Sequence, residues 1–71
     1  MVISLAIFPG QGLVGSRTVD DGTTLADFVS NEGLEDRSIC LNGQDILSSL
    51  WKTTLLTSGD EVVAVTPTKG N

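Results

Sequence analysis

Few residues of this chain have side chains that could carry out chemistry. The 71 residues include no histidine and a single cysteine, Cys40. Proteins hold zinc and other transition metals mainly through cysteine and histidine, so the composition argues against a metal site. Cys40 could be a reactive thiol, but a reactive thiol needs a nearby cation, metal ion or helix N-terminus, and its sequence neighbours supply none. Its position between Ile39 and Leu41 favours an ordinary strand residue.

Two pairs of neighbouring carboxylates, Asp20-Asp21 and Glu35-Asp36, are the other candidates for chemistry. Paired carboxylates can act as general acid and general base. Both pairs, however, flank loops, where solvated charge is the simpler interpretation. Neither pair belongs to a run that matches a calcium-binding loop. We therefore expect no catalytic centre in this chain and no cofactor.

The net charge of −5 narrows the choice of partner. Only four residues are basic, and they are scattered: Arg17, Arg37, Lys52 and Lys69. Proteins bind nucleic acids through clustered lysine and arginine, and anionic membrane surfaces attract basic segments. We therefore expect no nucleic acid and no membrane as a partner. The expected partner is another protein, and an oligomeric assembly is compatible with the sequence.

Two parts of the sequence are candidates for binding that partner. Trp51 is the only tryptophan and lies in a polar stretch. Tryptophan is enriched at binding hot spots. The alternative, which we favour, is that Trp51 covers one end of a core that contains few other aromatic residues. The second candidate is the C-terminal segment, which is either a frayed end or an extended strand offered to a partner. Its residues are Pro67, Thr68, Lys69, Gly70 and Asn71.

The apolar pattern of the first half predicts a hairpin and a helix. Residues 2–8 are apolar on both alternating faces, which is typical of a buried strand, and 13–19 supply a second strand in which Gly15 suggests a bulge. Thr24 is a predicted N-cap. Leu25, Phe28 and Val29 then share one face of a short helix over 25–32, and Gly33 is the expected end of that helix.

The second half predicts a further hairpin and a central strand. Residues 38–41 read as a strand, and Asn42-Gly43 is a strong signal for a tight hairpin turn. Residues 45–50 suggest a short strand followed by a turn. The strand over 61–65 is apolar on both faces, as expected of a central strand. The order hairpin, helix, hairpin, strand favours a β-grasp fold. A small SH3-like barrel is the competing interpretation, but such barrels do not contain a capped helix with one apolar face.

Three segments resemble the small β-grasp sulfur carriers of thiamine and molybdopterin synthesis, which are relatives of ubiquitin. The segments are 22–27, 41–43 and 56–62, and the resemblance covers about residues 18–66. It implies a first and a last strand that lie parallel at the centre of the sheet. In that family a C-terminal Gly-Gly carboxylate is adenylated with ATP by an activating enzyme and becomes a thiocarboxylate. This chain instead reads Lys69-Gly70-Asn71 at the corresponding place.

These observations predict one α+β domain of the β-grasp, ubiquitin-like class over residues 1–71, with an extended tail at 67–71. The expected function is that of a small non-catalytic protein-binding module or assembly subunit, acting through its sheet face and tail. A phage virion or capsid-decorating component would fit. The alternative is a sulfur carrier that becomes thiocarboxylated at Gly70 after removal of Asn71. Because the apolar segment 1–8 lacks a basic region, we expect a strand rather than a signal peptide, and a cytoplasmic or intracellular virion-assembly location.

Overall fold

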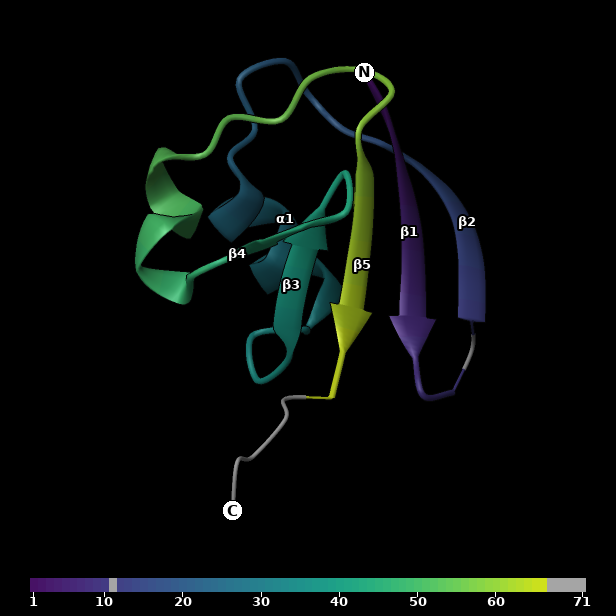
Figure 1. Ribbon diagram of the computed structural model, residues 1–71. Helices are drawn as coiled ribbons and strands as arrows, with labels where there is room; N and C mark the ends of the chain where they lie inside the picture. The colour runs from purple at the N-terminus through teal and green to yellow at the C-terminus, as the bar shows by residue number, and fades with distance from the viewer. Residues whose placement is uncertain (11, 67–71) are drawn as a thin grey trace.

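The computed structural model describes residues 1–10 and 12–66. Within them the chain forms a β-hairpin, an α-helix, a second hairpin, a 3-10 helix and a last strand (Figure 1). The bounds are β1 (Val2–Phe8), β2 (Gly12–Thr18), α1 (Leu25–Glu32), β3 (Ser38–Leu41), β4 (Gln44–Ile46), η1 (Ser48–Thr53) and β5 (Glu61–Val65).

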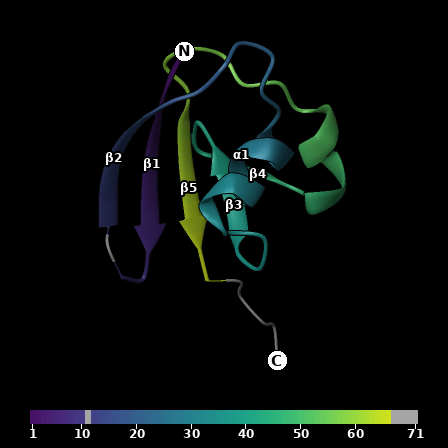
Figure 2. The same ribbon diagram turned by 180° about the vertical axis from the view of Figure 1, so that it is seen from behind.

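The described strands form one mixed sheet in the order β2-β1-β5-β3-β4. β1 and β5 run parallel to each other, and the other neighbouring pairs are antiparallel. Seen from behind, α1 lies over the face of the sheet near β3 and β5 (Figure 2). The predicted α+β class and the parallel pairing of the first and last strands are therefore confirmed.

The helix α1 begins and ends where the sequence predicts. The Thr24 hydroxyl oxygen accepts a hydrogen bond from the Asp27 amide at 3.1 Å, which satisfies an amide of the first turn. At the other end Gly33 adopts a left-handed conformation with φ of 72°, and its amide donates to the Ser30 carbonyl. The Leu34 amide donates to the Val29 carbonyl, which completes a glycine-terminated cap.

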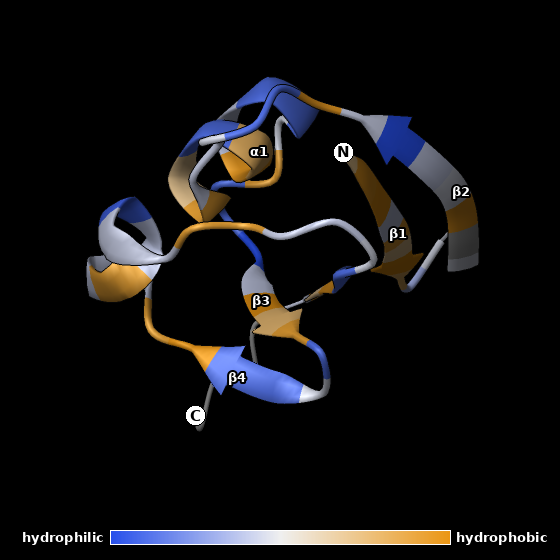
Figure 3. Ribbon diagram, turned by 90° about the horizontal axis from the view of Figure 1, so that it is seen from above, coloured by the Kyte–Doolittle hydropathy of each residue, from blue (hydrophilic) through white to orange (hydrophobic). Residues whose placement is uncertain are grey.

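The core lies between α1 and the inner face of the sheet. Phe28 is 1% exposed, so the helix places its aromatic ring in the core as predicted. Viewed from above, α1 lies on one side of the sheet, and the edge strand β4 is largely hydrophilic (Figure 3). The other buried apolar residues are Ile3, Leu5, Leu25, Val29, Leu34, Ile39, Trp51, Leu56, Val62 and Ala64.

The local irregularities match the sequence at two places and differ at one. Asn42 and Gly43 have φ values of 52° and 83°, which is the tight turn expected of this pair. The register of β1 and β2 shifts opposite Gly15, which confirms the bulge. The strand predicted within 45–50 is wrong in extent: β4 ends at Ile46, and the chain then enters η1, which contains Trp51. The division of the chain into a domain and a tail at 67–71 stays a prediction, since the tail lies outside the described residues.

Candidate functional site

The first candidate site is the place where the chain leaves β5. The Phe8 carbonyl oxygen, at the end of β1, accepts two hydrogen bonds of 3.0 Å, one from the Thr66 amide and one from Nη1 of Arg37. Arg37 directly precedes β3, and β5 lies between β3 and β1 in the sheet. The Arg37 side chain therefore reaches across the end of β5. This arrangement anchors the chain one residue before the C-terminal segment begins.

The predicted binding residues Pro67, Thr68, Lys69, Gly70 and Asn71 lie outside the described residues. Their expected role in contacting a partner stays a prediction. The structure does describe the end of β5 and Thr66, from which these residues continue and which we call the root of the C-terminal segment. β5 is hydrogen-bonded on one side to β1 and on the other to β3. A segment that follows such a strand starts from a rigid position in the fold.

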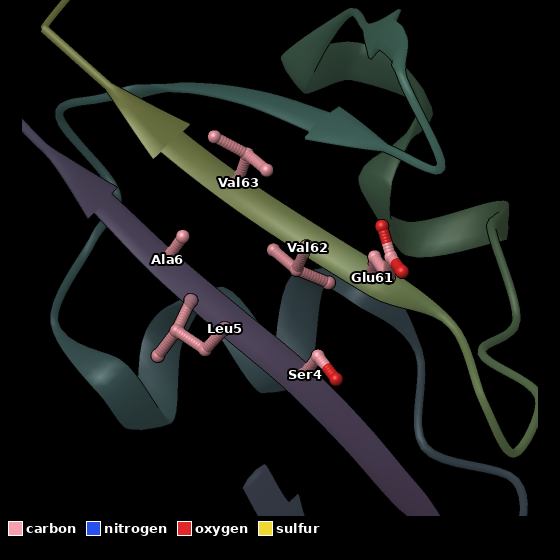
Figure 4. Close-up of a pocket in the computed structure, with 6 residues that line it drawn as sticks. All are labelled: Ser4, Leu5, Ala6, Glu61, Val62 and Val63. Atoms are coloured by element: carbon pink, nitrogen blue, oxygen red, sulfur yellow. The ribbon is translucent and has the colours of Figure 1, made fainter. Parts of the chain in front are cut away.

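The second candidate is a shallow hollow of about 320 Å³ over the two parallel strands (Figure 4). Ser4 and Ala6 of β1 and Glu61 and Val63 of β5 face it, because Ser4 pairs with Glu61 and Ala6 with Val63 in the register. The alternate residues of both strands, such as Leu5, point into the core and are buried. On the sheet face opposite α1, the side chains at the centre of the hollow are therefore small and apolar, and the Glu61 carboxylate lies at one end.

Cys40 lies on β3, opposite Val63 of β5 and opposite Asp45 of β4. It is half-buried and forms no disulfide. The sequence interpretation of Cys40 as a strand residue agrees with this position.

Trp51 is not an exposed anchor. It is only 8% exposed and belongs to the core cluster. Its indole N–H donates to the Ile46 carbonyl at 3.0 Å, so the polar edge of the ring is satisfied within the chain. The structure thus places Trp51, a residue of η1, at the edge of the core with its indole N–H against the end of β4. A contact of Trp51 with a partner stays a prediction.

A side-chain network around Asp60 was missed by the sequence analysis. Asn42 donates from Nδ2 to the Asp60 carboxylate at 3.0 Å, while the Thr57 amide and hydroxyl donate to it at 2.8 and 3.0 Å. Burial by itself would raise the pKa of Asp60, but these three hydrogen bonds outweigh it and lower the pKa below the ordinary value of 3.8. The spacing Thr57-x-x-Asp60 was the available signal for part of this network.

The acidic pairs do not converge on a common site. Asp20, Asp21, Glu35 and Asp36 are all exposed, and Asp21 lies 3.8 Å from the N-terminal ammonium group. Within residues 1–10 and 12–66, no three histidine, cysteine or acidic side chains are grouped so that they could hold a metal ion. The helices of this part of the chain are also too short and too polar to cross a membrane.

Comparison with known proteins places the fold. A scan against protein-family models found no match, and neither did a search of curated proteins. Among solved structures, the chain is similar to a chain of the protein–protein complex of subunits 1 and 2 of molybdopterin-converting factor from Helicobacter pylori 26695. The similarity covers 100% of both chains with a TM-score of 0.69 and 21% sequence identity.

The fold is thus that of the small β-grasp proteins, and the resemblance to their sulfur carriers is confirmed at the level of structure. The expectation of a small non-catalytic protein-binding module or assembly subunit, with a phage virion component as the example, is wrong. It is contradicted by the full-length match to a chain from a complex named for molybdopterin conversion.

Proposed function

We propose that this chain is a sulfur-carrier protein of the β-grasp type, which works together with a protein partner. The observation that carries the proposal is the full-length structural match to a subunit of molybdopterin-converting factor. The match includes both ends of the domain, so it is not limited to a common supersecondary motif. Molybdopterin conversion is the activity for which that complex is named, and the transfer of a carrier role to this chain is our inference.

The geometry around β5 supports the proposal. A carrier must hold its reactive end on a rigid root while the end itself enters a partner. β5 is paired on both sides, and the Phe8 carbonyl holds the Thr66 amide at 3.0 Å. Gly70 lies four residues beyond Thr66 in the sequence. An extended segment of four residues reaches about 13 Å, far enough to leave the surface of the domain.

The reactive group in this proposal is the carboxylate of Gly70, freed by hydrolysis of the peptide bond to Asn71. Attack of that carboxylate on ATP forms an acyl adenylate and releases pyrophosphate. A sulfide equivalent then displaces AMP, so that one carboxylate oxygen is replaced by sulfur. Glycine suits this step because the absence of a side chain lets the backbone approach a nucleotide closely. The chain serves as the substrate of the hydrolysis, the adenylation and the sulfur transfer, and other proteins supply the catalysis.

The open sheet face next to β5 supports a docking role in this proposal. Ala6 and Val63 give it a small apolar centre, and Phe8 is 46% exposed at the end of β1 where the chain leaves the sheet. A partner that covers this face would meet the root of the C-terminal segment at the same time. The expected partner is therefore a protein, as in the complex to which the fold is similar.

Intact-mass spectrometry of the protein from its native cells tests the proposal. We expect a fraction that has lost the mass of one asparagine residue, part of it heavier by the difference between sulfur and oxygen. As a control, Gly70→Ala should abolish the heavier species without changing the fold, as judged by circular dichroism. The proposal is wrong if every molecule keeps Asn71 and no sulfur is added.

A further inference from the structure

A second hollow, of about 250 Å³, lies on the flank of the domain away from β2. It is formed by the loop that precedes β3 and by the segment from β4 into η1, which lie on the same side of the sheet in Figure 1. We call it the flank groove and define it by Glu35, Asp36, Asp45, Ile46, Leu47 and Trp51. It shares no lining residue with the hollow on the sheet face.

One part of the flank groove is apolar and exposed. Trp51 forms a buried wall, whereas Leu47 is 64% exposed. Leu50, three residues on, is 49% exposed, and its amide donates to the Leu47 carbonyl at 2.8 Å, which fixes this turn. Leu47 lines the hollow together with Trp51 and Ile46, and Leu50 does not line it. These three side chains give the hollow an apolar part that suits an apolar partner side chain.

The other part of the groove is negatively charged. Glu35, Asp36 and Asp45 are exposed at its rim. Among the described residues, the ion pairs join the N-terminus to Asp21 and Arg17 to Glu32, so none of the rim carboxylates is paired there. Arg37 also lines the groove and keeps its positive charge while it donates from Nη1 to the Phe8 carbonyl. The three carboxylates outnumber this one guanidinium, so the lining is negative on balance and attracts positive charge.

We propose that the flank groove is a docking site for a basic, partly apolar segment of a partner protein. An apolar side chain of that segment rests on Leu47 and Trp51, and its lysine or arginine side chains meet the rim carboxylates. β4 is one of the two edge strands of the sheet and borders the groove, so a partner segment in the groove would lie along a sheet edge. Nucleic acids and anionic membranes are excluded as occupants, because the same carboxylates repel them.

The flank groove is also connected to the root of the C-terminal segment. Arg37 lines the groove and at the same time holds the Phe8 carbonyl, which accepts the Thr66 amide. A segment bound in the groove would therefore lie beside the residue that anchors the end of β5. The proposal does not depend on sulfur transfer, because no residue of the groove belongs to 67–71.

A peptide titration tests the proposal, with Trp51 as its reporter. Trp51 is the only tryptophan of the chain, so its fluorescence reports on the groove without a label. The probe is a blocked hexapeptide of alternating lysine and leucine. We expect saturable binding with a dissociation constant below about 1 mM, weakened by raising the salt from about 20 to about 300 mM. A hexapeptide with glutamate in place of lysine, and one with serine in place of leucine, should not bind.

Matched variants distinguish peptide binding in the flank groove from non-specific electrostatic binding of a basic peptide to an acidic protein. Glu35→Gln with Asp36→Asn should weaken binding about threefold to tenfold, while Asp20→Asn with Asp21→Asn makes the same charge change elsewhere and should alter it by less than about twofold. Leu47→Ser should weaken binding, whereas Leu55→Ser, at a residue equally exposed at 63%, should not.

Binding to 15N-labelled protein should shift the amide resonances of residues 35–38 and 45–51. The proposal is wrong if no saturation occurs below about 1 mM, if each variant and its control weaken binding equally, or if the shifts map to other residues. None of these outcomes bears on the mass of the C-terminus, so failure here is distinct from failure of the sulfur-carrier proposal.

Discussion

Asn42 and Asp60 join the end of β3 to the start of β5, at one end of the antiparallel β3–β5 pair. Nδ2 of Asn42 donates to the Asp60 carboxylate at 3.0 Å, and Oδ1 of Asn42 accepts the Glu61 amide at 2.9 Å. The backbone adds a third bond, from the Asn42 amide to the Glu61 carbonyl. The turn between β3 and β4 is thereby fastened to the start of β5. Asn42 can serve this role because its φ of 52° is tolerated by asparagine better than by most residues.

This network predicts a pH dependence of stability. The pKa of Asp60 in the folded protein is lower than its ordinary value of 3.8. The unfolded chain therefore binds more protons, so the stabilisation is present above 3.8 and is lost as the pH falls through the folded pKa. Urea unfolding from about pH 7 to about pH 2 should show a falling free energy of unfolding. Asp60→Asn should flatten this dependence, whereas Asp20→Asn should leave it unchanged; equal slopes for both variants would contradict the assignment.

Removal of the Asp60 carboxylate should destabilise the fold at neutral pH. Asp60→Ala leaves the Thr57 amide and the Asn42 amide group without their acceptor. Unpaired, partly buried donors cost about 1–3 kcal/mol of unfolding free energy. Thermal and urea unfolding measure this loss, and Asp36→Ala, at an exposed carboxylate, serves as the control. A loss no larger than that of the control would show that water replaces the network.

Phe28 should be the most costly position of the helix to truncate. Its side chain is 1% exposed and lies in the core between α1 and the sheet. Phe28→Ala should lower the free energy of unfolding by about 3–5 kcal/mol, which is most of the stability expected of a domain of this size. Leu55→Ala removes a similarly apolar side chain at a residue 63% exposed, and it should change stability by less than about 0.5 kcal/mol.

Gly43 should not tolerate a branched side chain. Its φ of 83° is strained for any residue with a Cβ, although no atom lies within 4 Å of the place where the Cβ would be. The expected loss for Gly43→Val is therefore conformational, about 1–2 kcal/mol, with the tight turn widened. Gln44→Val, at the exposed neighbouring strand residue, is the comparison. If Gly43→Val unfolds at the same urea concentration as the parent, the turn geometry is wrong.

Arg37 should control the root of the C-terminal segment. Arg37→Leu removes one of the two hydrogen bonds to the Phe8 carbonyl. We expect faster hydrogen exchange at the Thr66 amide and a stability loss of about 0.5–1.5 kcal/mol. Arg37→Lys, which keeps the charge but not the planar donor group, should restore this only in part. Unchanged exchange at Thr66 in both variants would mean that β5 alone holds the root.

The sequence predicts those features that depend on neighbouring residues. Thr24 and Gly33 bound the helix, and Asn42-Gly43 forms the turn, because the physical cause in each case lies within a few residues. The pairing of Asn42 with Asp60 and of Arg37 with Phe8 could not be predicted in this way, since these residues are 18 and 29 positions apart. η1 was missed because residues 48–53 lack a side-chain cap at Leu47. The flank groove depends on the packing of that unpredicted element against the loop before β3.

The place of β5 in the sheet sets the order in which the fold can be completed. β5 is the last of the described strands along the chain, yet it lies between β1 and β3, which have no direct pairing with each other. Until residues 61–65 are available, the two hairpins are separate and α1 has only part of a surface to cover. Closure over so long a stretch is entropically costly and slows folding. A nascent chain that still lacks residues 61–65 therefore cannot join its two hairpins into one sheet.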